Sequence, residues 1–235
     1  MKKLFITSMI LLCGFMFAKA QLGGANQYTH SGAQRTNTSG VNWGVRFGMN
    51  VSKLKGDKDT DLDDFKGRIG FHLGVAADYE FRNSMFLESG LYITTKGAKH
   101  DDDDEYEEWK DKYNITYLQL PVLYAFKYDL GNDTKFHIKA GPYFAVGLAA
   151  KNKWEVTYRG ETEKEDTKGF GKGEEGDYKT GLKRGDVGLL FGVGISMKQY
   201  YLGMNYEVGL TNINAYDDEG KIKTGSFNIS LGYNF

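Results

Sequence analysis

The sequence predicts an all-β fold, an eight-stranded antiparallel up-and-down transmembrane β-barrel, and three observations lead to this prediction. The closing stretch 226–235 alternates between apolar and polar residues over about ten positions, the length of a tilted membrane-crossing strand. Seven earlier stretches repeat the same two-faced pattern. The connections between these stretches are alternately short and long, which is typical of the two rims of a membrane barrel.

Residues 1–20 have the pattern of a secretory signal peptide. Lys2 and Lys3 precede an apolar run over 9–17, and Ala18-Lys19-Ala20 has the form of a cleavage site. The apolar run is shorter than the roughly 20 residues that a membrane-spanning helix needs. We therefore expect export of the chain and removal of this segment, which also contains the only cysteine, Cys13.

Composition separates the rest of the chain into a leader and a barrel. Residues 21–41 are rich in Gly, Asn, Ser and Thr, so we expect a flexible periplasmic leader ahead of a barrel over 42–235. A mean hydropathy of -0.50 argues against membrane-spanning helices, but only alternate residues of a barrel strand meet lipid. The net charge of -1 predicts no nucleic-acid partner.

Each expected strand has an apolar face for lipid and a polar or small-residue face for the lumen. In 69–81, for example, Ile69 and Phe71 alternate with Gly70 and His72. The closing stretch has Phe227 and the residues that follow at every second position on its apolar face. The expected strands are 43–51, 69–81, 85–94, 118–127, 135–148, 187–197, 201–210 and 226–235.

The connections give the expected topology. Short turns at 83–84, 129–133 and 198–199 would lie on the periplasmic side, together with the N-terminus. Aromatic residues at the strand ends beside these turns predict a girdle at the membrane interface. Its expected members are Trp43, Tyr79, Phe81, Phe86, Tyr124, Phe126, Tyr128, Phe136, Tyr200, Tyr201, Tyr233 and Phe235, and the expected long extracellular loops are 52–68, 96–113, 149–185 and 211–225.

A soluble lipocalin-like barrel is the alternative architecture, with its apolar face inside and its charges outside. The polar face here is mostly Gly, Ala and Ser, which suits a narrow lumen better than a wet exterior. Charges of both signs on that face predict a lumen plugged by ion pairs, because unpaired buried charges are costly. The expected lumen network is Arg46, Asp78, Glu80, Glu88, Lys127, Lys135, Lys139 and Glu207.

A family resemblance is carried by the stretches 44–54, 91–99, 117–123, 139–143, 186–194, 205–213 and 231–235. In these stretches the chain resembles the PorT-type outer-membrane β-barrel family of Bacteroidetes, and the resemblance extends over nearly the whole expected mature chain. The resemblance implies a barrel in the outer membrane and, through the member that gives the family its name, an accessory role in protein secretion. It implies no functional residue.

Other candidate sites are weaker. The acidic run 101–108 could bind Ca²⁺ or a basic partner, or could be a solvated loop tip. The calcium-loop pattern that starts at Asp57 fails, because Leu62 and Arg68 stand at the required glycine and glutamate positions. His100 beside Asp101 or Asp103 is the only histidine and carboxylate combination placed for catalysis.

The loop 151–185 is longer than a hairpin connection requires, so it is either a contact surface or an exposed loop whose sequence has drifted without consequence.

The two prolines lie within expected strands, where they cannot donate to the ladder. A turn centred near Gly131 would set Pro121 opposite Gly141 and beside Pro142, which predicts a bulge or local break between the two strands. A local bend explains both prolines without a function, and a lateral gate used by a partner is the alternative.

Together these patterns predict a structural or binding module of the cell envelope, without enzymatic activity, cofactor or metal. The expected partners are outer-membrane lipid, the barrel-assembly machinery through the C-terminal strand, and envelope or secretion proteins. Two other functions stay open: an accessory component of protein secretion, and a small pore.

Overall fold

The structure is a computed structural model, and it describes residues 40–56, 66–103, 107–158, 161–173, 179–216 and 220–235. The expected signal peptide, most of the expected leader and the stretch that begins at Asp57 lie outside these residues. No helix in the described part of the chain is long and apolar enough to cross a membrane.

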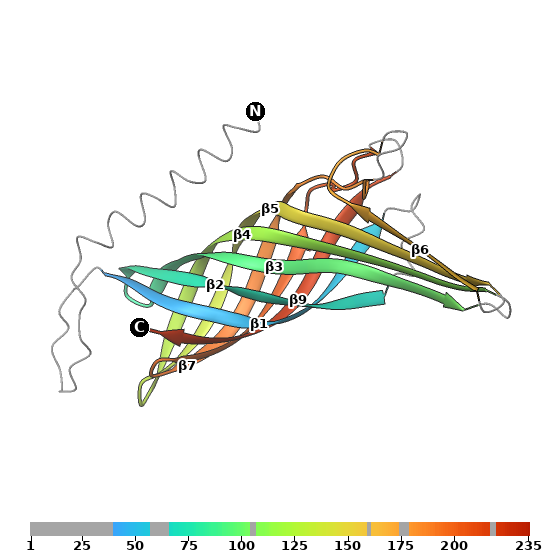
Figure 1. The fold of residues 1–235 in the computed structure, drawn as a ribbon. Coiled ribbons are helices and arrows are strands. Elements are labelled where there is room, and N and C mark those ends of the chain that lie inside the picture. Colours follow the sequence, from blue (N-terminus) through green and yellow to red (C-terminus); the bar gives the residue numbers. More distant parts are fainter. Residues whose placement is uncertain (1–39, 57–65, 104–106, 159–160, 174–178, 217–219) are drawn as a thin grey trace. The chain divides into compact units, whose positions relative to one another are not determined.

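The described residues form antiparallel strands that close into a ring (Figure 1). Each strand pairs with the next around the ring in the order β1-β2-β3-β4-β5-β7-β8-β9, and β9 returns to β1 with Gly44 opposite Asn234. This confirms the predicted fold. The strands are β1 (Val41–Gly56), β2 (Lys66–Arg82), β3 (Met85–Asp103), β4 (Glu107–Gly131), β5 (Thr134–Tyr158), β6 (Glu161–Lys168), β7 (Gly185–Met197), β8 (Tyr200–Gly209) and β9 (Ile222–Asn234).

Side chains alternate between an exposed apolar exterior and a buried polar interior. On β1, Phe47 and Met49 are exposed, whereas Arg46 before them and Asn50 after them are buried. This arrangement is the reverse of a soluble barrel, because most of the large apolar residues on the ring strands face outward. The ring therefore has the surface of a barrel that meets lipid.

Two-residue turns join the strands at one rim, at Asn83–Ser84, Asn132–Asp133 and Lys198–Gln199. Ser84, Asn132 and Lys198 have positive φ values of 65°, 51° and 53°. Such left-handed residues match the right-handed twist of the strands that a tight hairpin joins. The predicted short turns at this rim are therefore confirmed.

At the opposite rim, the expected loops 96–113 and 149–185 begin much later than predicted. β3 and β4 continue as a hairpin until Asp103 pairs with Glu108, and β5 continues to Tyr158. β6 was not predicted; it pairs with the end of β5, from Lys151 opposite Lys168 to Tyr158 opposite Glu161. Outside a bilayer a strand can have charged residues on both faces, so its charge density resembles that of a loop.

The chain segments beyond β6 and β8 fold back over the barrel mouth. Gly147 N–H donates to the carbonyl of Arg184 at 2.7 Å, and Lys183 N–H donates to the carbonyl of Ile213 at 2.7 Å. Leu182 and Ile213 are buried in a cluster with residues of the barrel wall such as Ile115. These parts of the expected loops 149–185 and 211–225 therefore form a cap.

The two prolines interrupt the ladder between β4 and β5. Pro121 lies opposite Tyr143, and pairing resumes at Tyr124 opposite Ala140, without ladder pairs at Val122 and Leu123. The predicted local break is confirmed, although it has no bulge because the register is the same on both sides. The predicted pairing of Pro121 with Gly141 is wrong by two residues, because the turn centres one residue later than expected.

Candidate functional site

The lumen contains two buried ion pairs near the short-turn end. Lys127 pairs with Asp78, and Lys139 pairs with Glu88, so each pair links different strands of the ring. The four side chains are nearly fully buried. A charge in this position is stable only when it is paired, because it has left water.

Arg46 contributes to the same region through other contacts. Its guanidinium donates to Asn234 Oδ1 at 2.6 Å and lies 4.3 Å from the centre of the Tyr201 ring. This combination of a hydrogen bond and a cation–π contact joins β1, β8 and β9 where the ring closes.

Two of the expected network residues lie elsewhere. Glu80 and Lys135 are exposed near the short turns, and Glu80 accepts a hydrogen bond from Ser84 N–H. The alternation of their strands places both side chains on the inward face, as predicted, but the lumen opens to solvent at this rim. Their inclusion in a buried network was therefore wrong.

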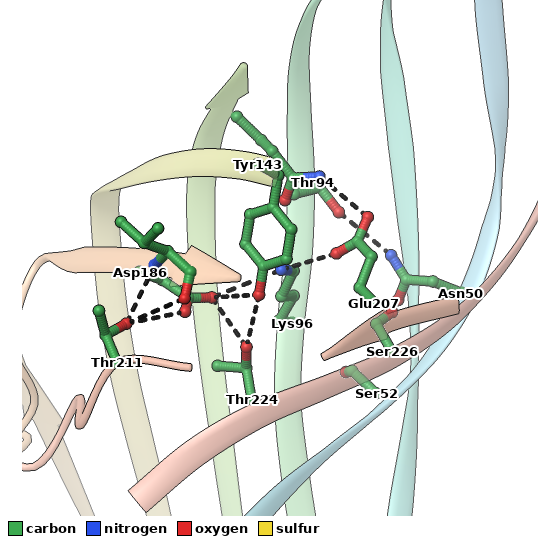
Figure 2. A network of polar contacts seen from close by, with 12 residues as sticks. Asn50, Ser52, Thr94, Lys96, Tyr143, Asp186, Glu207, Thr211, Thr224 and Ser226 are labelled. Atoms are coloured by element: carbon green, nitrogen blue, oxygen red, sulfur yellow. Dashed lines mark hydrogen bonds and ion pairs between the residues drawn. The ribbon is translucent and has the colours of Figure 1, made fainter. Parts of the chain in front are cut away.

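A second cluster, around Lys96, lies nearer the capped end, because Lys96 pairs with Ile115 of the cluster under the cap. Figure 2 shows its polar contacts. The Lys96 ammonium is 2.7 Å from Glu207 Oε2 and 3.5 Å from Asp186 Oδ2, and it lies 4.2 Å from the centre of the Tyr143 ring. Lys96, Asp186 and Glu207 are all almost completely buried. One cation thus meets two carboxylates, which brings β3, β7 and β8 together across the lumen.

Uncharged side chains donate hydrogen bonds to both carboxylates. Thr224 and Tyr143 donate to Asp186 Oδ2 at 2.8 and 3.2 Å, and Thr211 donates to Asp186 Oδ1 at 3.3 Å. Gln119 and Asn228 donate to Glu207 Oε1, each at 2.9 Å. Both carboxylates are therefore stabilised by hydrogen bonds from uncharged groups as well as by the Lys96 ammonium that they share.

Sequence reasoning included Glu207 but missed Lys96 and Asp186. Lys96 was assigned to an extracellular loop, and Asp186 was placed just before its strand. Both residues continue the inward alternation of their strands, Lys96 after Thr94 and Asp186 before Gly188. Extending the period-two pattern by one step would have found them.

The rest of the lumen is filled. His72 points inward as expected, and His137 also points inward; each is 2.8 Å from a serine hydroxyl, Ser230 and Ser196 respectively. The cavity between the ion pairs has a volume of about 40 Å³ and is lined by residues such as Arg46, Glu88 and Glu207. This is room for water molecules and not for an organic ligand.

The aromatic residues near the short turns mostly face outward. Phe81 contacts Tyr124 with ring centres 5.8 Å apart, and Tyr233 is 5.8 Å from both Tyr200 and Phe235. Two expected girdle members point into the lumen instead, because Phe86 and Tyr201 have inward parity and are buried. The outward members that are exposed or half-exposed are Trp43, Tyr79, Phe81, Tyr124, Phe126, Tyr128, Phe136, Tyr200, Tyr233 and Phe235.

The ends of β3, β4 and β5 continue past the ring and, with β6, form a four-stranded sheet that we call the projecting sheet (Figure 1). β5 leaves β7 after Val146 and pairs with β6 from Lys151 onward. Twelve further residues separate Val146 from the end of β5 at Tyr158, a length of roughly 40 Å at about 3.3 Å per residue.

The two faces of the projecting sheet differ in chemistry. The face that continues the lumen has Trp109 and Trp154, whose rings meet edge to face with centres 5.6 Å apart, together with Tyr113, Val156 and the acids Asp111, Glu163 and Glu165. Trp109 is 42% exposed, which is a large apolar area for a position beyond the lipid-facing band. The opposite face is mainly lysine and acid, including the pairs Lys151–Asp166 and Lys164–Glu155.

The weaker candidate sites gain no support. The side chains of the acidic run 101–108 lie outside what the structure describes, so its Ca²⁺ hypothesis and the combinations of His100 with Asp101 or Asp103 are not resolved. Among the described residues no group of three or more His, Cys, Asp or Glu side chains is placed to hold a metal ion.

A family model described as "Outer membrane protein beta-barrel domain" matches residues 30–215. The chain therefore belongs to this family of outer-membrane β-barrels, and its location is the outer membrane. A comparison with curated proteins gave no match.

Solved structures with a similar fold include three bacterial surface or outer-membrane proteins. Ail, the attachment invasion locus protein of Yersinia pestis, is 18% identical, with 83% of this chain and 98% of Ail covered and a TM-score of 0.36. Neisserial surface protein A is 12% identical, with 83% and 99% covered and a TM-score of 0.43. OprG from Pseudomonas aeruginosa is 14% identical, with 83% and 95% covered and a TM-score of 0.34.

Proposed function

We propose that this protein is a binding module of the cell surface, in which a plugged barrel anchors the projecting sheet outside the outer membrane. The observation that carries the proposal is the Trp109–Trp154 pair, in which Trp109 is exposed and Trp154 is half-buried, on a sheet that extends roughly 40 Å beyond the last β5–β7 pairing. The ligand of this module is another macromolecule, bound on the aromatic face.

The aromatic face suits such an interaction. Tryptophan and tyrosine are enriched at the centres of protein interfaces, because they bury a large area with little loss of side-chain freedom. Trp109 and Trp154 come from adjacent strands whose backbone pairing is continuous, so the pair is held on a rigid support. Tyr113 and Asn152 pair with each other on the same face, nearer the barrel mouth.

The lumen favours binding over transport. Its charged groups pair with each other, and the cavity between them is about 40 Å³, so the barrel acts as a support and not as a pore. We assign the module no enzymatic activity. We further infer that the signal peptide 1–20 directs export and that the C-terminal strand is recognised by the barrel-assembly machinery.

A second candidate function rests on the resemblance to the PorT-type barrels of Bacteroidetes. In that case the protein is an accessory component of protein secretion, and its partners are other envelope or secretion proteins. The same aromatic face would then contact a secretion component, with outer-membrane lipid around the barrel in both cases.

Photo-crosslinking in native membranes tests the proposal. A benzoylphenylalanine at Trp109 should crosslink to a partner, and Trp154→Ala should reduce the yield because it removes half of the aromatic pair. The same probe at Lys153, on the opposite face of β5, is the matched control and should not crosslink to that partner.

Identification of the crosslinked species separates the two functions. Recovery of stoichiometric secretion components by mass spectrometry would support the second candidate. An equal crosslink from Lys153, or no crosslink at Trp109 in cells that have the folded protein, would contradict binding on the aromatic face.

A further inference from the structure

Lysines gather on the outer surface of the barrel where β1 meets β9, at the rim with the long connections. Lys55 lies directly opposite Lys223 in the β1–β9 ladder, with Lys53 and Lys221 one step away on the same face. Directly opposed like charges on a sheet are unfavourable unless an anion lies between or above them. The outward positions of β1, β8 and β9 that the structure describes have no acidic residue.

A groove of about 380 Å³ opens beside these lysines. Gly225 forms its floor: a Cβ at this position would approach only Lys55 Cε at 3.7 Å and the Glu207 carbonyl at 3.9 Å. Tyr206 and Val208 of β8 form one wall, and Lys55 and Lys223 form the other. The groove therefore combines cationic and apolar sides.

The position of the groove indicates its occupant. Val51 pairs with Phe227 in the β1–β9 ladder, and both are exposed members of the lipid-facing surface. Lys53 lies two residues beyond Val51, and Lys55 lies four beyond it, roughly 7 and 13 Å along the strand. The lysines thus lie just past the apolar band, at the level of the lipid headgroups.

We propose that this groove binds a phosphorylated glycolipid of the surrounding leaflet, with its phosphate between Lys55 and Lys223 and its acyl chains against Val51, Phe227 and Tyr206. An amphipathic lipid fits both walls of the groove, whereas a soluble anion would use only the lysines. The site is separate from the aromatic face of the projecting sheet and does not depend on the proposed function.

Native mass spectrometry of the full-length protein in detergent micelles tests the site, with monophosphoryl lipid A as the probe. Lys55→Ala/Lys223→Ala should weaken binding by about 25-fold, since a lysine near an anionic lipid surface contributes on the order of fivefold. Gly225→Leu keeps every charge but fills the groove, so it should also weaken binding. Lys135→Ala/Lys198→Ala, at the other rim, is the matched control and should bind like the native protein.

Three outcomes would overturn the proposal. They are equal affinity for the dephosphorylated lipid, equal affinity of the Lys55→Ala/Lys223→Ala and native proteins, and full competition by inositol hexakisphosphate, which would indicate a site for soluble polyanions. Circular dichroism melting of each variant checks the fold. Removal of two opposed lysines should leave the barrel as stable as the native protein or slightly more stable.

Discussion

Lys96 provides the positive charge of the buried polar cluster near the capped end of the lumen. Its ammonium is shared by Asp186 and Glu207, and the ring of Tyr143 lies over the same charge. Because each carboxylate also accepts neutral hydrogen bonds, loss of the lysine would not release the acids to solvent. It would leave two buried negative charges close together.

We predict that Lys96→Met strongly destabilises the barrel, by about 3 to 5 kcal/mol, the usual cost of removing one partner from a buried ion pair. Urea unfolding of the protein refolded into lipid vesicles measures this loss. Lys112→Met, at an exposed position of the projecting sheet, is the control and should change stability little.

The double variant Lys96→Met/Glu207→Gln should recover part of the loss, because the amide removes one of the two unpaired charges. A Lys96→Met protein that unfolds at the native urea concentration would show that the cluster contributes nothing to stability.

For single residues, the period-two alternation along a strand predicted which side chains face the lumen, and charge alone did not. The inward assignment of Asp78, Glu88, Lys127 and Lys139 followed from period two alone, and the structure pairs them within the lumen. Glu80 and Lys135 have the same parity, but depth along the barrel decides burial, and the sequence does not give depth. The inward position of Lys96 was not predicted, because the charged residues that follow it have the composition of a loop.

At the scale of elements, β5 has two roles along its length. Its first half pairs with β7 and belongs to the barrel, and its second half pairs with β6 and belongs to the projecting sheet. Phe170 lies against Gly147 near this exchange, where a Cβ on the glycine would come within 2.2 Å of the Phe170 ring. A small residue is therefore needed where β5 changes its neighbour.

The β5–β6 hairpin should loosen when the pH falls. The hydrogen bond from Lys164 lowers the pKa of the Glu155 carboxyl, and the hydrogen bond from Lys151 lowers the pKa of Asp166. A carboxyl with a lowered pKa in the folded state stabilises that state above its unfolded pKa, about 4. This stabilisation is lost as the pH falls through the lowered values.

Hydrogen exchange of the β6 amides, corrected for the intrinsic pH dependence, measures the effect. We expect lower protection at pH 3 than at pH 7 in β6, and unchanged protection in β7. Lys151→Met/Lys164→Met should abolish the difference. The prediction fails if β6 of the native protein is equally protected at both pH values.

The sequence predicted the eight barrel strands because lipid imposes a strict alternation on them. Beyond the bilayer this constraint ends, so β6 and the long ends of β3 to β5 have charged residues on both faces, a pattern that predicts loops. The cap was missed for a related reason: Leu182 and Ile213 are isolated apolar residues in polar stretches, and only tertiary packing identifies them as buried.

In the whole molecule, the ion pairs and the cap fill the lumen at successive levels along the barrel. The lumen is filled by Lys127–Asp78 and Lys139–Glu88 near the short turns, by the Lys96 cluster farther along, and by Leu182 and Ile213 at the mouth. We predict no steady ion-sized conductance from the pure protein in planar bilayers. Steady single-channel steps that persist with the folded protein would contradict a plugged barrel.

The orientation of the molecule in the outer membrane follows from the positions of its connections. We expect the projecting sheet outside the cell and the short turns in the periplasm, because the long connections all lie at one rim. The only cysteine, Cys13, lies within the expected signal peptide, so single-cysteine variants of the exported chain would have one reactive thiol each. A membrane-impermeant maleimide added to intact cells should label Lys153→Cys on the projecting sheet and spare Asn83→Cys and Lys198→Cys at the turns. After the outer membrane is permeabilised, all three should react, which shows that the spared thiols are accessible in the folded protein. Labelling of the turn positions alone in intact cells would invert the topology and would place both the aromatic face and the lysine groove on the periplasmic side.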